Sequence, residues 1–175
     1  MTRQLSLFEG DARANAARGA VAVAAAPVPQ EVRDLARLLP PGVRLGTSSW
    51  HFPGWRGIVW ADAVAPGDLS RYGLAAYAQH PLLGAVGVDR SFYVPRTARQ
   101  YASYARQVPD SFRFVVKAPS LLTSPWLHGD NGGRGSANER FLDAGYAIER
   151  FVEPVCEGLG ATAGALLFQF PPLGR

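Results

Sequence analysis

Four short apolar segments, each ending in a cluster of polar and aromatic residues, constrain the fold of this chain most strongly. They are VRLGTSSWHFPGW (43–55), AVGVDRSFYVP (85–95), FRFVVKAP (112–119) and GALLFQFPP (164–172). Each begins as an apolar, β-branched or aromatic run and breaks at Pro or Gly, and segments with helical periodicity lie between them. Strands that alternate with helices predict βαβ units and a parallel sheet. Ligands of such sheets bind beyond the carboxyl ends of the strands, so a site is expected there.

Residues with useful chemistry follow the ends of these segments. The candidate catalytic residues are Lys117, Asp89 and His51. Lys117 would bind an anionic group or act as a base with a tuned pKa, and Asp89 would act as a hydrogen-bond acceptor or base. His51 would be their acid–base partner. Two alternatives stay open: His51 packs in a loop beside Trp55, and Asp89 serves a structural salt bridge or turn.

Aromatic and amide side chains accompany these three residues. Trp50, Trp55, Phe92 and Tyr93 would form flat apolar walls suited to a sugar ring or a nucleobase. Ser91 and Gln169 would also contact the ligand, with Gln169 both donating and accepting hydrogen bonds. The alternative for the two tryptophans is that they anchor a long loop.

Lysine occurs once among the 18 basic residues, at Lys117, and all the others are arginine. Unlike a guanidinium group, an amine can have its pKa tuned and can form a Schiff base. The bias toward arginine therefore singles out Lys117 as a functional residue. The competing interpretation is a solvated strand end that happens to keep a lysine.

Composition narrows the class of protein. The chain has 175 residues, about one domain, and 47% of them are hydrophobic, enough for a core. No apolar run reaches the ~18 residues of a membrane span and no secretory signal is visible, so a cytoplasmic location is the default expectation. The net charge of +4 permits nucleic-acid contact without demanding it. The single cysteine, Cys156, is expected to be buried in a helix face, and the histidines and carboxylates show no metal-ligand spacing.

The chain divides into an N-terminal arm, 1–40, and a domain, 41–175. The arm is rich in Ala, Gly, Pro and Arg, with a flexible linker expected at 9–29 and one short helix at 30–39. Within the domain, helices are expected at 69–79, after a Thr97–Gln100 capping box, and after a Ser136–Glu139 capping box with a kink at Pro154. The Gly-rich loop 119–135 would be a lid or a disordered connection.

The motifs GTSSWHFPGWRG, VGVDRSFYVPRT, PDSFRFVVKAP and GALLFQFPP together resemble the opening half of the YecE-like family, domain of unknown function 72. The resemblance covers 43–172 and implies the N-terminal half of a TIM-barrel-like (β/α) fold with about four parallel strands; it implies no established activity. The sequence departs from the family at Gly87 and Asp89, which replace a Glu and an Asn. It departs again at Ser124, in place of a His, and at His51, where Ser is more usual.

A complete (β/α)₈ barrel needs about 250 residues, and four strands cannot close one. The first and fourth strands would be bare edges. The sequence therefore predicts a fragment, a truncated gene product or half of a dimer, and truncation is favoured.

Gln4, Leu5, Ser6, Leu7 and Phe8 resemble the short peptide by which bacterial polymerases and repair proteins bind the replication sliding clamp. Leu7 and Phe8 would fill an apolar pocket and Gln4 would hydrogen-bond at its rim. Alternatively, this apolar terminus packs on the domain.

Three functional interpretations follow. The first is a TIM-barrel-like protein that binds or processes a small polar, sugar-like or nucleotide-like ligand; whether it is an enzyme stays open, and no cofactor is indicated. The second is an accessory protein of DNA replication or repair that is recruited to the sliding clamp. The third is a non-functional fragment.

Overall fold

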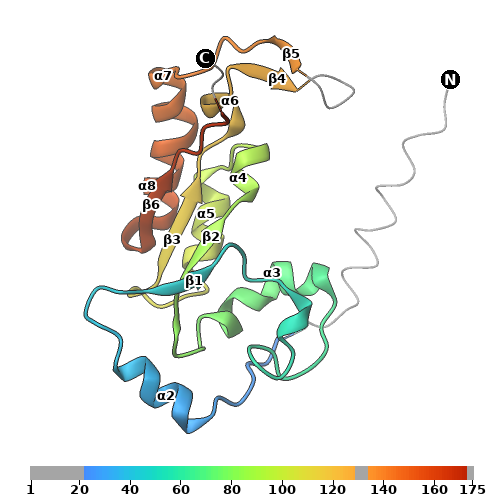
Figure 1. The fold of residues 1–175 in the computed structure, drawn as a ribbon, viewed down its shortest axis with the longest axis vertical. Coiled ribbons are helices and arrows are strands. Elements are labelled where there is room, and N and C mark those ends of the chain that lie inside the picture. Colours follow the sequence, from blue (N-terminus) through green and yellow to red (C-terminus); the bar gives the residue numbers. More distant parts are fainter. Residues whose placement is uncertain (1–21, 129–133, 173–175) are drawn as a thin grey trace, which may run out of the picture.

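The computed structural model describes residues 22–128 and 134–172. Its centre is a parallel sheet with strand order β1-β2-β3-β6 (Figure 1). The strands are β1 (Leu45–Thr47), β2 (Leu83–Val88), β3 (Arg113–Lys117) and β6 (Ala163–Leu167). Helices lie between them along the chain, which confirms the predicted α/β class with four parallel strands.

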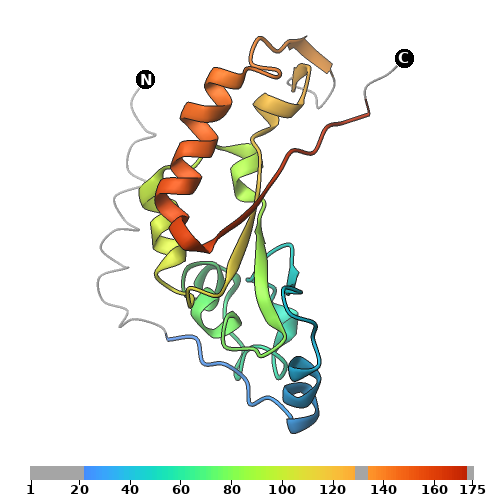
Figure 2. The same cartoon turned by 90° about the vertical axis from the view of Figure 1, so that its left-hand side faces the viewer.

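One face of the sheet is covered by α3 (Pro66–Tyr77), α5 (Ala98–Ala105) and α8 (Glu153–Leu159). In Figure 2, α5 and α8 lie together on the left of strands β2 and β3. The strands alternate accordingly: Val86, Val88, Phe114 and Val116 are buried against the helices, while their neighbours in sequence are half-buried. This alternation gives the sheet one core face and one open face.

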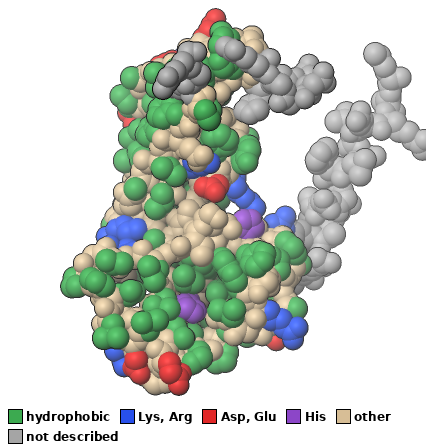
Figure 3. Space-filling model, viewed as in Figure 1, with side chains coloured by type: hydrophobic (Ala, Val, Ile, Leu, Met, Phe, Trp, Pro, Cys, Tyr) green, Lys and Arg blue, Asp and Glu red, His purple; other side chains and the backbone are tan. Residues whose placement is uncertain are grey.

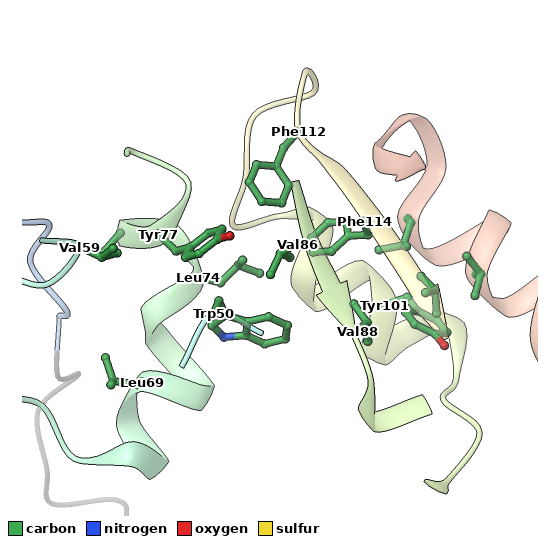
Figure 4. Packing of buried hydrophobic residues seen from close by; sticks show 14 of the residues in the cluster. Trp50, Val59, Leu69, Leu74, Tyr77, Val86, Val88, Tyr101, Phe112 and Phe114 are labelled. Atoms are coloured by element: carbon green, nitrogen blue, oxygen red, sulfur yellow. The ribbon is translucent and has the colours of Figure 1, made fainter. Parts of the chain in front are cut away.

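The core of the protein is rich in aromatic side chains. Tyr77, Phe112 and Phe114 pack edge to face in series, with ring centroids 6.2 Å and 5.4 Å apart (Figure 4). Tyr77 also joins two strands, because its hydroxyl accepts from the Thr47 backbone N–H at 3.1 Å and donates to the Ala85 carbonyl at 3.0 Å. These two hydrogen bonds connect β1 and β2 near the point where their register shifts.

The predicted capping box at the start of α5 is confirmed. The Thr97 hydroxyl accepts from Gln100 N at 3.3 Å, and the Gln100 side chain accepts from Thr97 N at 3.0 Å. The helix expected at 69–79 is α3, which begins earlier because Pro66 occupies its first turn.

The capping box predicted at Ser136 and Glu139 is wrong. Ser136 lies in β5 (Arg134–Ala137), which pairs antiparallel with β4 (Trp126–His128). The buried Asn138 amide donates to the carbonyls of Leu121 and Ser124 and so holds this segment as a loop. The helix begins instead at Ala144, after the N-cap residue Asp143, whose carboxylate accepts from Tyr146 N.

The kink expected at Pro154 takes the form of a widened turn. The helix α7 (Ala144–Ala147) leads into a π-turn, η2 (Ile148–Val152), and then into α8. Proline has no N–H and its ring clashes with the carbonyl four residues before it, so the preceding turn widens. The helix stops where Gly160 adopts a φ of +52°.

The described part of the N-terminal arm, 22–40, contains α2 (Gln30–Arg37), which buries none of its residues. The segment before α2 differs from the predicted linker, because Ala24 and Ala26 form backbone hydrogen bonds with the chain around Trp60. Small apolar side chains allow this close approach to the buried Trp60 ring.

The remaining short elements are η1 (Pro53–Trp55), α4 (Arg90–Tyr93), α6 (Ser120–Thr123) and η3 (Gly160–Thr162). The expected loop at 119–135 therefore contains α6 and β4, and β5 begins at its end. Cys156 is exposed, so its predicted burial is wrong: it lies on the solvent side of α8, whose buried side chains include Val155 and Leu159. No helix within the described ranges is long and apolar enough to cross a membrane.

Candidate functional site

A concavity of about 430 Å³ lies on the open face of the sheet and extends to the carboxyl ends of the strands. It is lined by Arg44, Gly46, Thr47, Ser48, Ala85, Val86, Gly87, Asp89, Val115, Lys117, Leu167 and Gln169. Three predicted site residues at the carboxyl ends of three different strands, Asp89, Lys117 and Gln169, therefore share one cavity. In the middle of Figure 3, charged side chains of both signs lie close together among hydrophobic ones.

Lys117 is the last residue of β3, and its side chain is half-buried. Its ammonium nitrogen lies 4.4 Å from the centroid of the Phe92 ring, which provides a cation–π contact. Within residues 22–128 and 134–172 it forms no ion pair. Lys117 therefore lines the cavity as a cation that has no ion-paired carboxylate among the described residues.

The turn after β2 places Phe92 under this lysine. The Ser91 hydroxyl lies 2.6 Å from the Lys117 carbonyl oxygen and 2.8 Å from that of Val88, and it can donate its one proton to either. Ser91 is completely buried, so the structure gives it a role in joining α4 to β3 and leaves it outside the cavity. Asp89, one residue beyond β2, is exposed and caps no helix with its side chain.

The structure separates the four aromatic candidates. Trp50 is buried in the core, where its indole N–H donates to the Ser70 carbonyl at 3.3 Å. Trp55 packs against Trp60 and Tyr77, with centroids 6.3 Å and 6.0 Å away. Neither tryptophan lines the cavity, in line with the interpretation that they anchor the loop after β1.

The other two aromatic residues stand beside each other, with ring centroids 5.3 Å apart. Phe92 supports the ammonium group of Lys117, whereas Tyr93 is 79% exposed and does not line the cavity.

His51 lies next to Trp50, with ring centroids 6.0 Å apart, and does not line the cavity. Its Nδ1 atom is buried and has no hydrogen-bond partner in the described part of the chain. Burial, with a smaller contribution from the positive charge of Arg90, lowers the pKa of His51. The lowered pKa favours the neutral imidazole, and His51 is not among the residues that line the cavity.

Sequence reasoning missed three polar residues of the cavity: Arg44, Thr47 and Ser48. Thr47 is the last residue of β1, and Ser48 is the residue after it. The expectation that ligands bind at the carboxyl ends of parallel strands, which pointed to Asp89 and Lys117, therefore also applied to them. The Thr47 hydroxyl is used internally, 2.7 Å from the Ser49 carbonyl, whereas Ser48 is exposed. Arg44, at the other end of β1, donates to the Ser111 carbonyl at 3.1 Å.

Other candidate sites find no further support. No group of three or more His, Cys, Asp or Glu side chains in the described ranges could hold a metal ion. The predicted clamp-binding residues Gln4, Leu5, Leu7 and Phe8 lie outside the described residues. The site thus has two cations, a carboxylate, an amide and two hydroxyl groups around one concavity.

Fold and cavity together define an α/β protein with helices on one side of a parallel sheet and a polar concavity at the carboxyl ends of its strands. This chain belongs to the family described as protein of unknown function DUF72, whose model matches residues 44–175. The resemblance to YecE-like proteins is thereby confirmed. No match is found among curated proteins.

Two solved structures are similar, both of a DUF72 family protein from Enterococcus faecalis V583. The structure at 3.10 Å is 22% identical, has a TM-score of 0.52, and covers 73% of this chain and 39% of that chain. The structure at 2.52 Å is 22% identical, with a TM-score of 0.48 and coverage of 75% and 41%. The first supports the fold, and this chain spans well under half of the length of that relative.

Proposed function

We propose that the concavity at the strand ends binds a small polar ligand through an anionic group that contacts Lys117. The observation that carries the proposal is the ammonium group of Lys117, which lines the cavity beside Phe92 and has no ion-pair partner in the described ranges. A half-buried cation gains most from an anion that enters with the ligand, since charge-assisted hydrogen bonds are about twice as strong as neutral ones.

The remaining polar groups favour a sugar-like or nucleotide-like ligand. The Asp89 carboxylate accepts hydrogen bonds from hydroxyls, while Gln169 and Ser48 can both donate and accept them. A phosphate on Lys117 with a ribose or hexose toward Asp89 would use all of these groups. If the ligand is also transformed, Asp89 is the base and Lys117 stabilises the developing negative charge.

Isothermal titration calorimetry with ribose 5-phosphate, AMP, ribose and inorganic phosphate tests this proposal. Lys117→Met keeps much of the side-chain length and removes the charge. We expect it to weaken binding of the phosphorylated probes by about tenfold or more, the loss of one charge-assisted hydrogen bond.

The matched control is Arg99→Met, which removes an exposed cation from α5 on the covered side of the sheet. This variant should bind as the unchanged chain does. Equal losses in both variants would show that net charge rather than the Lys117 site governs binding. No loss in Lys117→Met would refute the assignment of Lys117 to the binding site.

We also propose a second role, recruitment to the bacterial sliding clamp, on the basis of Gln4, Leu5, Leu7 and Phe8. What favours it is the position of the motif in the sequence, ahead of the folded domain. A labelled peptide of residues 1–12 should bind the clamp with a Kd of about micromolar strength, and changing Leu7 and Phe8 to Ala should abolish binding. An unchanged affinity in the double variant would exclude this role.

A further inference from the structure

A second group of polar side chains lies outside the concavity, just beyond the carboxyl end of β2. It consists of Arg90, Ser70 and His51, none of which lines the concavity. Arg90 is the first residue of α4, and its guanidinium group donates to the Ser70 hydroxyl at 2.7 Å. The indole of Trp50, which lies against α3 (Figure 4), donates its N–H to the Ser70 carbonyl at 3.3 Å. Ser70 on α3 therefore connects Arg90 to the loop that carries His51.

Arg90 carries a charge that no carboxylate balances. The residue is exposed, and within residues 22–128 and 134–172 it forms no ion pair, although Asp89 precedes it in the chain. A guanidinium group has five N–H donors, and the bond to Ser70 is the one that the described residues accept. The other donors form a planar fork that matches the oxygens of an oxoanion.

His51 supplies a further donor beside this charge. Its Nδ1 atom is buried and has no hydrogen-bond partner in the described part of the chain. Because a buried N–H without an acceptor is costly, the neutral ring keeps its proton on Nε2, which becomes the donor. Burial and, second, the charge of Arg90 lower the pKa of His51, so the two side chains are close enough to interact.

We infer that Arg90, His51 and Ser70 form a binding site for a phosphate group, separate from the concavity that contains Lys117. The phosphate would accept hydrogen bonds from the guanidinium fork and from His51 Nε2, while Ser70 holds the guanidinium group in place. Donors on two separate segments suit the three or four oxygens of a phosphate better than the two oxygens of a carboxylate. An anion between them would also offset the unbalanced charge of Arg90.

The short helix α4 keeps this site apart from Lys117. Phe92 lies two residues after Arg90 on α4, and its ring centroid is 4.4 Å from the Lys117 ammonium nitrogen. Residues two apart on a helical turn point to different sides. Phosphate bound at Arg90 is therefore not the anionic group proposed for Lys117, and the inference stands whether or not the concavity binds a ligand.

Nuclear magnetic resonance of the chain labelled with ¹⁵N-histidine tests the inference at about pH 7.5. We expect inorganic phosphate to shift the His51 Nε2 signal saturably, with a Kd of about 1 mM or lower, and to leave His80 unchanged. The spectrum of His51→Gln assigns the signal. Lys117→Met should show the same shift, because the signal reports its own site and not the concavity.

Two further probes identify the source of the phosphate. Ribose 5-phosphate should shift the same signal, and ribose should not. Tighter binding of ribose 5-phosphate than of inorganic phosphate would indicate the phosphate group of a larger ligand, and equal binding would indicate free phosphate. An equal shift with ribose would overturn the inference.

Three variants locate the site. Arg90→Met should weaken phosphate binding by about tenfold or more, and Ser70→Ala, which keeps the net charge, by about threefold. Arg71→Met removes an exposed cation next to Ser70 on α3 and is the matched control that should bind as the unchanged chain does. The inference is overturned by the absence of a saturable His51 shift in the unchanged chain, by a shift that survives Arg90→Met, by its loss in Lys117→Met, or by an equal loss in Arg71→Met.

Discussion

Gly46 shows how a single residue sets the distance between two strands. A Cβ atom at this position would overlap the carbonyl oxygen of Ala85 on β2. Tyr77 then bridges the same two strands with its hydroxyl. The position of β1 beside β2 therefore depends on the absence of a side chain at Gly46 and on the hydrogen bonds of the Tyr77 hydroxyl.

Gly46→Ala is expected to lower the free energy of unfolding by about 2 kcal/mol, because β1 must move away from β2 to make room. Chemical denaturation measures this change. Gly84→Ala is the matched control on the neighbouring strand, where the new Cβ would lie 3.5 Å from Arg44 Cγ, an ordinary contact. A control as destabilised as Gly46→Ala would show that loss of glycine itself, rather than the close approach, is responsible.

His51 is expected to make the stability depend on pH. Burial lowers its pKa in the folded protein, so the folded state prefers the neutral ring while the unfolded chain binds a proton near pH 6.5. The contribution is complete above about pH 6.5 and is lost as the pH falls toward the lowered pKa.

Denaturation curves between about pH 7.5 and pH 5 should therefore show a smaller loss of stability in His51→Gln than in the unchanged chain. His80, whose pKa is also lowered by burial, remains in both proteins and supplies a common background. Parallel curves for the two proteins would contradict the role given to His51.

At the scale of elements, the helices on the covered face determine which side of each strand is buried. The helices α5 and α8 pack closely, because Gly158 faces α5 where a Cβ would overlap the carbonyl oxygen of Ala98. The capping box fixes the start of α5, and the π-turn before Pro154 adjusts the path of the helix leading into α8. A small displacement of either helix would loosen the packing of the core around Tyr101 and Val155.

Thr97→Ala removes the hydroxyl that accepts from Gln100 N and should cost about 1 kcal/mol of stability. Ser103→Ala removes a hydroxyl from the middle of the same helix, where it donates to the Gln100 carbonyl. Alanine is the better helix former there, so this control should be neutral or stabilising. Thermal unfolding compares the two, and equal losses would refute the capping role.

At the scale of the whole molecule, one layer of helices covers one face of a parallel sheet. A single aromatic core extends from Trp50 and Trp60 to Phe151, so the chain should unfold cooperatively rather than behave as a non-functional fragment.

We expect the 175-residue chain to unfold in a single cooperative thermal transition, because one core joins its elements. Circular dichroism measures the transition. A broad transition with dye binding to exposed apolar surface would support the fragment interpretation instead.

Local sequence signals determined the strands, the α/β class and the start of α5. Alternation of apolar residues, breaks at Pro and Gly, and the Thr97–Gln100 spacing act over a few neighbouring residues, so they can be identified without knowing the fold. The same reasoning placed Asp89, Lys117 and Gln169 at one edge, because parallel strands end together.

Tertiary structure decided which of the side chains at the strand ends are exposed to a ligand and which are buried. Trp50 and Ser91 lie near the carboxyl ends of strands as Lys117 does, yet both are buried, because segments distant in sequence cover them and use their polar atoms. Ser136 has the spacing of a helix cap, but its pairing in β5 and the hydrogen bonds of Asn138 prevail. Burial depends on which remote segment packs on a residue, and that information is spread over the whole chain.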